Sequence, residues 1–127
     1  MIPCIGYECE YQGKNVYFSG DTYFDPEKLK ALMDKGVLTP SRYEHLVNKE
    51  WSKFDVILHE AGVPPIHTAT KVLQQFPEEI KKKMYLYHVA TKDMPKEGDL
   101  QKAAAGFENS IVIIEKSDGD IFDRNLE

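Results

Sequence analysis

The stretch that decides the fold is residues 54–89, FDVILHEAGVPPIHTATKVLQQFPEEIKKKMYLYHV. It opens with the short apolar run 54–58 and closes with a second such run, 84–87, and both are typical of buried strands. Two prolines and a segment with helical spacing of apolar residues separate the runs. A strand, a helical connection and a second strand make the parallel crossover unit, so this stretch predicts an α/β fold.

Three of the chain's four histidines lie in this stretch, and two of them end its strands. His59, followed by Glu60, ends the first strand, and His88 ends the second, while His67 lies between them. In parallel sheets the chemistry is found beyond the carboxyl ends of the strands. Side chains that can bind a metal or move a proton therefore fall where a site is expected.

The residues before this stretch extend the predicted sheet. Residues 3–11 alternate between apolar and polar side chains, and the turn-forming residues 12–15 lead to a second apolar run, 16–18. This pattern predicts a hairpin of two strands. Asp21 follows the second of them, so it is expected at the same edge as the histidines.

Two helices are expected between the hairpin and the central stretch. Asp25 and Pro26 suit the cap and the first position of one helix, which Gly36 ends. Ser41 has the capping-box spacing for the other. The apolar run 111–114 predicts a final strand near the end of the chain.

The composition fits one globular domain. The chain has 127 residues, of which 42% are hydrophobic and 29% charged, which supports a packed core and argues against disorder. Its net charge of −5 argues against a surface that binds polyanions, but bound cations can reverse the local sign at a phosphate site. No run of about 18 apolar residues occurs, so no membrane partner is expected.

The cysteines and the start of the chain predict a cytoplasmic protein. Cys4 and Cys9 lie in one predicted strand, about 16 Å apart at about 3.3 Å per residue, which is too far for a disulfide. Two free thiols suit a reducing compartment, and the first residues lack the features of a signal peptide.

Taken singly, each polar residue has an ordinary structural explanation. Asp21 could cap a turn, His59 could bond a backbone carbonyl, and His88 could be a core histidine. Taken jointly, these residues and Glu60 end strands of one sheet and can converge. Carboxylate and imidazole ligands together suit zinc, manganese or iron, and a Glu and a His that do not bind the metal would suit proton transfer. The spacing thus slightly favours a metal-assisted hydrolase.

Four ordered segments carry a family resemblance. They are Phe18–Thr22 (FSGDT), Asp55–Gly62 (DVILHEAG), Ile66–Thr68 (IHT) and Leu86–His88 (LYH). Over about residues 4–115 the chain resembles the second half of the metallo-β-lactamase superfamily, closest to its phosphodiesterase branch and the tRNA 3′-end endonucleases (tRNase Z). It also resembles proteins of that fold that carry a cyclic-nucleotide-binding domain. The resemblance implies half of an αβ/βα sandwich, with a mixed sheet and flanking helices.

The resemblance also implies roles for four side chains. Asp21 matches the carboxylate that bridges two metal ions, and His88 matches the last histidine ligand of the second ion. Glu60 and His67 match the catalytic pair, in which the carboxylate orients an imidazole that protonates the leaving oxygen. The implied cofactor is a pair of divalent ions, zinc with manganese or iron as alternatives, and the implied substrate is a phosphodiester.

The superfamily's His-x-His-x-Asp-His motif has no counterpart, because no two histidines lie two residues apart. Two ligands cannot close a two-metal site. We therefore expect residues 1–127 to be the C-terminal half of the domain, without its N-terminal half. We expect this chain alone to be inactive and to bind metal weakly or not at all. Its open sheet face is expected to pair with the missing half or with a second copy.

Two hypotheses from other classes stay open. The chain could be a non-catalytic interaction or scaffold module that keeps the fold without the chemistry. It could also be a small stand-alone binding domain in which Glu60, His67 and His88 serve stability alone. In that case, replacing His67 by Ala would lower the melting temperature and leave activity unchanged.

Overall fold

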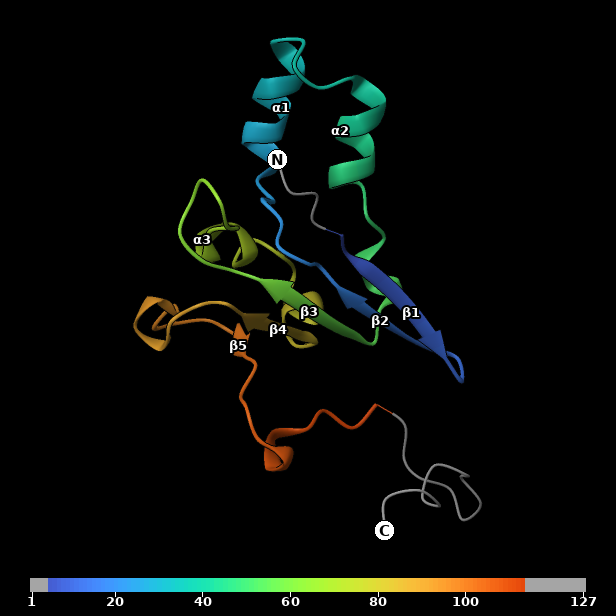
Figure 1. Ribbon diagram of the computed structural model, residues 1–127, viewed down its shortest axis with the longest axis vertical. Helices are drawn as coiled ribbons and strands as arrows, with labels where there is room; N and C mark the ends of the chain where they lie inside the picture. Colours follow the sequence, from blue (N-terminus) through green and yellow to red (C-terminus); the bar gives the residue numbers. More distant parts are fainter. Residues whose placement is uncertain (1–4, 114–127) are drawn as a thin grey trace.

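The computed structural model describes residues 5–113 of the chain. Within this range, five strands form one sheet in the order β1-β2-β3-β4-β5. β1 and β2 pair antiparallel, and each later pair is parallel. The protein is therefore an α/β protein with a mixed sheet and flanking helices (Figure 1). The strands are β1 Tyr7–Tyr11, β2 Lys14–Phe18, β3 Val56–Glu60, β4 Met84–Tyr87 and β5 Gln101–Lys102.

The connections hold four α-helices and three short 3-10 helices in the described part of the chain. Figure 1 shows α1 and α2 as a pair that stands beyond the sheet. No helix among residues 5–113 is long and apolar enough to cross a bilayer. The α-helices are α1 Pro26–Asp34, α2 Pro40–Val47, α3 Thr70–Leu73 and α4 Glu78–Lys81, and the 3-10 helices are Trp51–Lys53, Thr91–Asp93 and Phe107–Asn109.

The starts of α1 and α2 follow the capping rules, with one correction to the prediction. The Asp25 carboxylate accepts the Lys28 N–H at 3.1 Å and caps α1, as its sequence predicts. The prediction that Ser41 caps the second helix is wrong. Pro40 takes the first helical position, so the cap falls on Thr39, whose hydroxyl oxygen accepts the Arg42 N–H at 3.2 Å.

The last strand is not where the apolar run predicted it. Residues 111–113 form no strand, and Ile114 lies outside the described residues. The fifth strand is instead Gln101–Lys102, which pairs with β4 and continues in a bond from the Ala103 N–H to the Leu86 oxygen at 2.8 Å. Two polar residues carry no strand periodicity, so this strand is set by the free edge of β4 rather than by local pattern.

One face of the sheet carries the core. Because strand order follows chain order, right-handed connections all cross the same face. Ile57, Met84 and Leu86 point to that face and are fully buried. The helices and loops cover them with Phe24, Phe54, Ala61, Val72, Leu73, Ile80 and Val89, and Trp51 packs against this cluster.

The opposite face is only half covered. Tyr7 is 56% exposed there, and its strand neighbours across the sheet, Phe18 and Leu58, are partly buried. Cys9 shares this face as an exposed free thiol, whereas Cys4 lies outside the described residues. That this face pairs with an N-terminal half or a second copy stays a prediction.

Candidate active site

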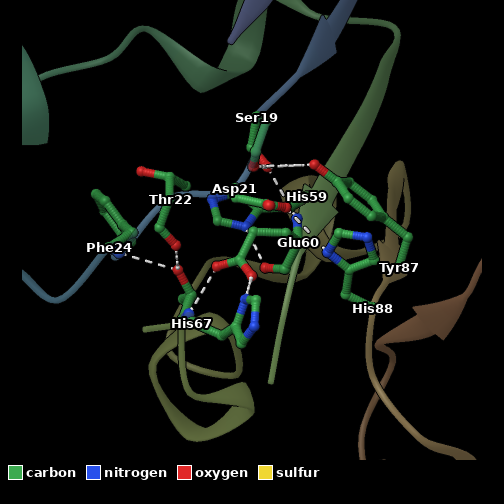
Figure 2. Close-up of polar contacts among 11 residues, drawn as sticks. Ser19, Asp21, Thr22, Phe24, His59, Glu60, His67, Tyr87 and His88 are labelled. Atoms are coloured by element: carbon green, nitrogen blue, oxygen red, sulfur yellow. Dashed lines mark hydrogen bonds and ion pairs between the residues drawn. The ribbon is translucent and has the colours of Figure 1, made fainter. Parts of the chain in front are cut away.

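The parallel strands bring the four predicted site residues to one edge of the sheet. Asp21 follows β2, Glu60 is the last residue of β3, and His88 follows β4. His67 comes from the loop between β3 and α3. Figure 2 shows the four side chains grouped there, and the His67 and His88 ring centres are 5.9 Å apart. Their proximity is thus observed, while the roles assigned to them stay predictions.

Glu60 and His67 form a buried pair. Nδ1 of His67 lies 2.5 Å from Oε2 of Glu60, and the Thr68 N–H donates to the other oxygen, Oε1, at 2.7 Å. The Glu60 side chain is fully buried. Since the carboxylate can only accept, Nδ1 of His67 carries the shared hydrogen. The fold thereby fixes the ring and leaves Nε2 as the ring nitrogen without a protein partner among residues 5–113.

Two glycines allow this close packing. A Cβ on Gly62 would lie 2.9 Å from Cβ of His67, closer than real side chains approach, so only glycine lets the His67 loop fold back onto Glu60. Gly20 has φ of +61°, and a Cβ there would lie 2.3 Å from the Ile5 carbonyl oxygen. Gly20 therefore permits the turn that carries Asp21 to the edge.

Asp21 and His88 form the second pair, which is open to solvent. Nδ1 of His88 lies 3.0 Å from Oδ1 of Asp21, and the side chains are 52% and 48% exposed. His88 adopts φ of +64°, a conformation that costs free energy for a residue with a Cβ. Such strain clusters at functional sites, so the backbone of His88 supports a role beyond packing.

Ser19 links the ends of β2, β3 and β4 by hydrogen bonds. Its Oγ accepts the Glu60 N–H at 2.9 Å and donates to the Gly20 carbonyl oxygen at 2.7 Å. The Tyr87 hydroxyl donates to the same carbonyl at 2.9 Å and lies 3.0 Å from Ser19 Oγ. Burial raises the pKa of Tyr87, which keeps this donor protonated.

Thr68 joins the Glu60 loop to the segment after Asp21. Its hydroxyl donates to the Thr22 carbonyl at 2.8 Å and accepts the Phe24 N–H at 2.9 Å, and Thr68 is fully buried. Neither Ser19 nor Thr68 is among the site residues predicted from the motifs. Both lie inside the motif segments, beside Gly20 and His67, and that adjacency was the available signal.

The donor atoms fit a divalent metal. One ligand atom each of Glu60, His67 and His88 lie within 4.8 Å of one another, and Asp21 adds a carboxylate oxygen beside His88. Carboxylate oxygens and imidazole nitrogens are both ligands that zinc accepts. Both oxygens of Glu60 already accept hydrogen bonds, and Nδ1 of His67 is engaged with one of them, so the more available metal ligands are Asp21 and His88.

His59 belongs to the other side of β3. It is 1% exposed, and its Nδ1 lies 2.7 Å from the Glu60 carbonyl oxygen. Burial lowers the pKa of His59, since the interior disfavours the charged ring. It is therefore a neutral histidine behind the site and no part of the Asp21–His88 edge.

The comparisons with known proteins identify the family. A family model described as Anti-Pycsar protein Apyc1 matches residues 3–111, most of the chain. The chain belongs to the anti-Pycsar Apyc1 family. Within curated proteins, it is 38% identical over 110 residues to the cGMP-dependent 3′,5′-cGMP phosphodiesterase A of Dictyostelium discoideum. It is 36% identical over 113 residues to the cAMP/cGMP-dependent 3′,5′-cAMP/cGMP phosphodiesterase B of the same organism.

These alignments cover 87% and 89% of this chain but only 12% and 10% of the relatives, so the chain spans about a tenth of their length. The family match also corrects the assignment to the metallo-β-lactamase superfamily made from the motifs. The matching family is the anti-Pycsar Apyc1 family, and neither relative is named as a β-lactamase-like or tRNA-processing enzyme. Short His, Asp and Glu motifs at strand ends were too general to select between families.

Proposed function

We propose that this chain supplies one wall of the active site of a metal-dependent phosphodiesterase that opens 3′,5′-cyclic nucleotides. The observation that carries the proposal is the meeting of two carboxylate–histidine pairs, Glu60–His67 and Asp21–His88, at one sheet edge. The substrate class draws support from the two relatives, both named as cyclic-nucleotide phosphodiesterases.

In this proposal the two pairs divide the chemistry. Asp21 and His88 would hold a divalent ion, which would neutralise charge on the phosphate. Glu60 orients His67 through Nδ1, so that Nε2 gives a proton to the ribose oxygen that leaves phosphorus. Water supplies the new P–O bond, one ester P–O bond breaks, and the product is a nucleoside monophosphate.

The remaining metal ligands are proposed to come from outside residues 1–127, from an N-terminal half of the domain or from a second copy. Asp21 and His88 provide two donors, and a closed site needs more. The 127-residue chain should therefore be inactive alone and bind zinc weakly. Calorimetry that finds two tightly bound zinc ions per isolated chain would contradict this part of the proposal.

The catalytic proposal is tested on the protein expressed from its complete reading frame. Hydrolysis of 3′,5′-cAMP and 3′,5′-cGMP is measured with and without a chelator, and the chelator should abolish it. His67→Gln should lower kcat by about 10²–10⁴-fold and leave bound metal in place, because it removes only the proton donor. Activity that persists in the chelator contradicts metal dependence. A lower melting temperature with unchanged kcat would instead favour a purely structural Glu60–His67 pair.

A further inference from the structure

A cavity of about 310 Å³ lies behind the site, between α2 and the helix-covered face of the sheet. Asp21 lines it, so the cavity opens onto the edge that carries the two pairs. Its other walls include Tyr17 and His59 from the strands and Arg42 and Leu46 from α2. The proposed chemistry uses only Asp21 of these residues.

His59 presents an unpaired hydrogen-bond acceptor to this cavity. Its Nδ1 must carry the hydrogen, because its partner at 2.7 Å is a backbone carbonyl, the oxygen of Glu60. In the neutral ring Nε2 is then an acceptor, and it has no protein partner in the described part of the chain. No buried side-chain nitrogen or oxygen of the described residues lacks a partner, so Nε2 of His59 keeps a small contact with the solvent of the cavity, where water or a ligand N–H can donate to it.

The walls around His59 are flat and aromatic. The ring centres of Trp51, Phe24 and Tyr17 lie 6.0, 6.1 and 6.5 Å from that of His59, and all three residues line the cavity. Rings of this kind bind planar heteroaromatic groups by stacking and by edge contacts. A ligand that suits both features is planar and carries an N–H donor.

Two cationic side chains line the cavity, Arg42 on α2 and Lys49 shortly after the end of α2. Lys49 is engaged with Glu8 at 2.8 Å, whereas Arg42 has no ion pair within residues 5–113. Arg42 can therefore pair with an anionic ligand. A ligand that carries both an aromatic base and a phosphate suits a cavity lined by aromatic rings, Arg42 and Asp21.

We propose that this cavity is the base subsite of the proposed phosphodiesterase. It takes the purine of the cyclic nucleotide, with a base N–H donated to Nε2 of His59 and the phosphate directed to the Asp21–His88 edge. The inference rests on the proposed function for the identity of the ligand, but its test does not require catalysis.

Trp51 makes the test direct, because it is the chain's single tryptophan and lines the cavity. Fluorescence of the 127-residue chain is titrated, in a chelator, with 3′,5′-cGMP, 3′,5′-cAMP and adenosine, and with dimethyl phosphate as a base-free diester. The nucleotides and adenosine should change Trp51 emission saturably, and dimethyl phosphate should not. Purine riboside, which lacks the exocyclic N–H of adenosine, should bind about tenfold more weakly.

A cavity-filling variant and a matched control complete the experiment. Leu46→Phe narrows the cavity from α2 and should weaken nucleotide binding about tenfold or more. Leu32→Phe makes the same change on α1, where the side chain is 37% exposed and lines no part of this cavity, and should leave binding unchanged. Equal effects of the two variants, or no saturable response to any nucleotide, overturn the subsite.

The outcomes separate this inference from the proposed function. Hydrolysis of cyclic nucleotides by the complete protein, with no Trp51 response and an unchanged KM in Leu46→Phe, overturns the subsite and leaves the function standing. A saturable response to nucleotides that Leu46→Phe weakens, without hydrolysis by the complete protein, supports the subsite and overturns the function.

Discussion

The two carboxylate–histidine pairs at the sheet edge have the same chemistry and opposite surroundings. In Glu60–His67 the carboxylate is fully buried, the histidine is 30% exposed, and the N–O distance is 2.5 Å. In Asp21–His88 both side chains are about half exposed and the distance is 3.0 Å. The chain itself satisfies both oxygens of Glu60, whereas among the described residues only His88 is paired with Asp21.

This difference indicates that the buried pair stabilises the fold, whereas the exposed pair is available for chemistry. A buried carboxylate must be fully paired, so Glu60 is tied into the fold and fixes the His67 loop. An exposed pair contributes little to stability, because water and salt screen it. Asp21 and His88 can therefore give up their mutual contact and bind an external ligand at a small cost in free energy.

Replacing Glu60 should damage the fold most. Glu60→Ala removes the acceptor for the Thr68 N–H and for His67 Nδ1 in a buried position, and should lower the free energy of unfolding by about 3–5 kcal/mol. Urea unfolding measures this loss. Asp21→Ala, which removes a half-exposed carboxylate, is the matched control and should cost less than about 1 kcal/mol. Losses of equal size would show that the two pairs do not differ as described.

The parts of the fold that depend on local pattern were predictable. The hairpin, the Asp25 cap and the buried runs of β3 and β4 all follow from periodicity and capping chemistry, and the structure confirms them. Of the strand expected at 111–114, the described residues 111–113 form none, because apolar residues resemble a strand while pairing is decided by which edge of the sheet is free. β5 formed instead from two polar residues beside β4.

The site was predictable as far as topology reaches. Parallel strands place Asp21, Glu60 and His88 at one edge whatever the loops do, so their proximity followed from strand order. The contrast in burial between the two pairs did not follow, because it depends on how the 61–69 loop folds back over Glu60. That path requires Gly62 to pack against His67, and no sequence pattern predicts this contact. The motifs also led to a wrong family assignment, and the family match corrected it.

His59 adds an intermediate effect, through pH. Burial lowers its folded pKa below the unfolded value of about 6.5, so the unfolded chain binds the proton more readily. The contribution of neutral His59 to the free energy of unfolding is then fully present above about pH 6.5. It declines as the pH falls below this value, by at most about 1.4 kcal/mol per pH unit. Urea unfolding over this range measures the slope. His59→Gln cannot take up the proton and should show a shallower slope, and an unchanged slope would mean that other groups cause the decline.

Asp21→Asn should have the smallest effect on stability and a large effect on metal binding. The substitution keeps the size of a half-exposed side chain and removes one charge, so the free energy of unfolding should change by less than about 1 kcal/mol. In the protein expressed from its complete reading frame, the substitution removes a charged metal ligand. Loss of a residue that only hydrogen-bonds to a ligand already weakens metal binding by up to about 100-fold, so Asp21→Asn should weaken it by about 100-fold or more. Calorimetry with zinc measures the second effect.

Asp34→Asn is the control for this last variant, since Asp34 is also an exposed carboxylate, 57% accessible, paired with Lys30 at 3.1 Å on α1. It should match Asp21→Asn in stability and leave metal binding unchanged. If the two variants bind zinc equally well, the exposed pair is an ordinary surface contact and the strained backbone of His88 needs another cause. If Asp21→Asn alone loses the metal at nearly unchanged stability, the exposed pair holds the ion, while the buried pair holds the loop beside it.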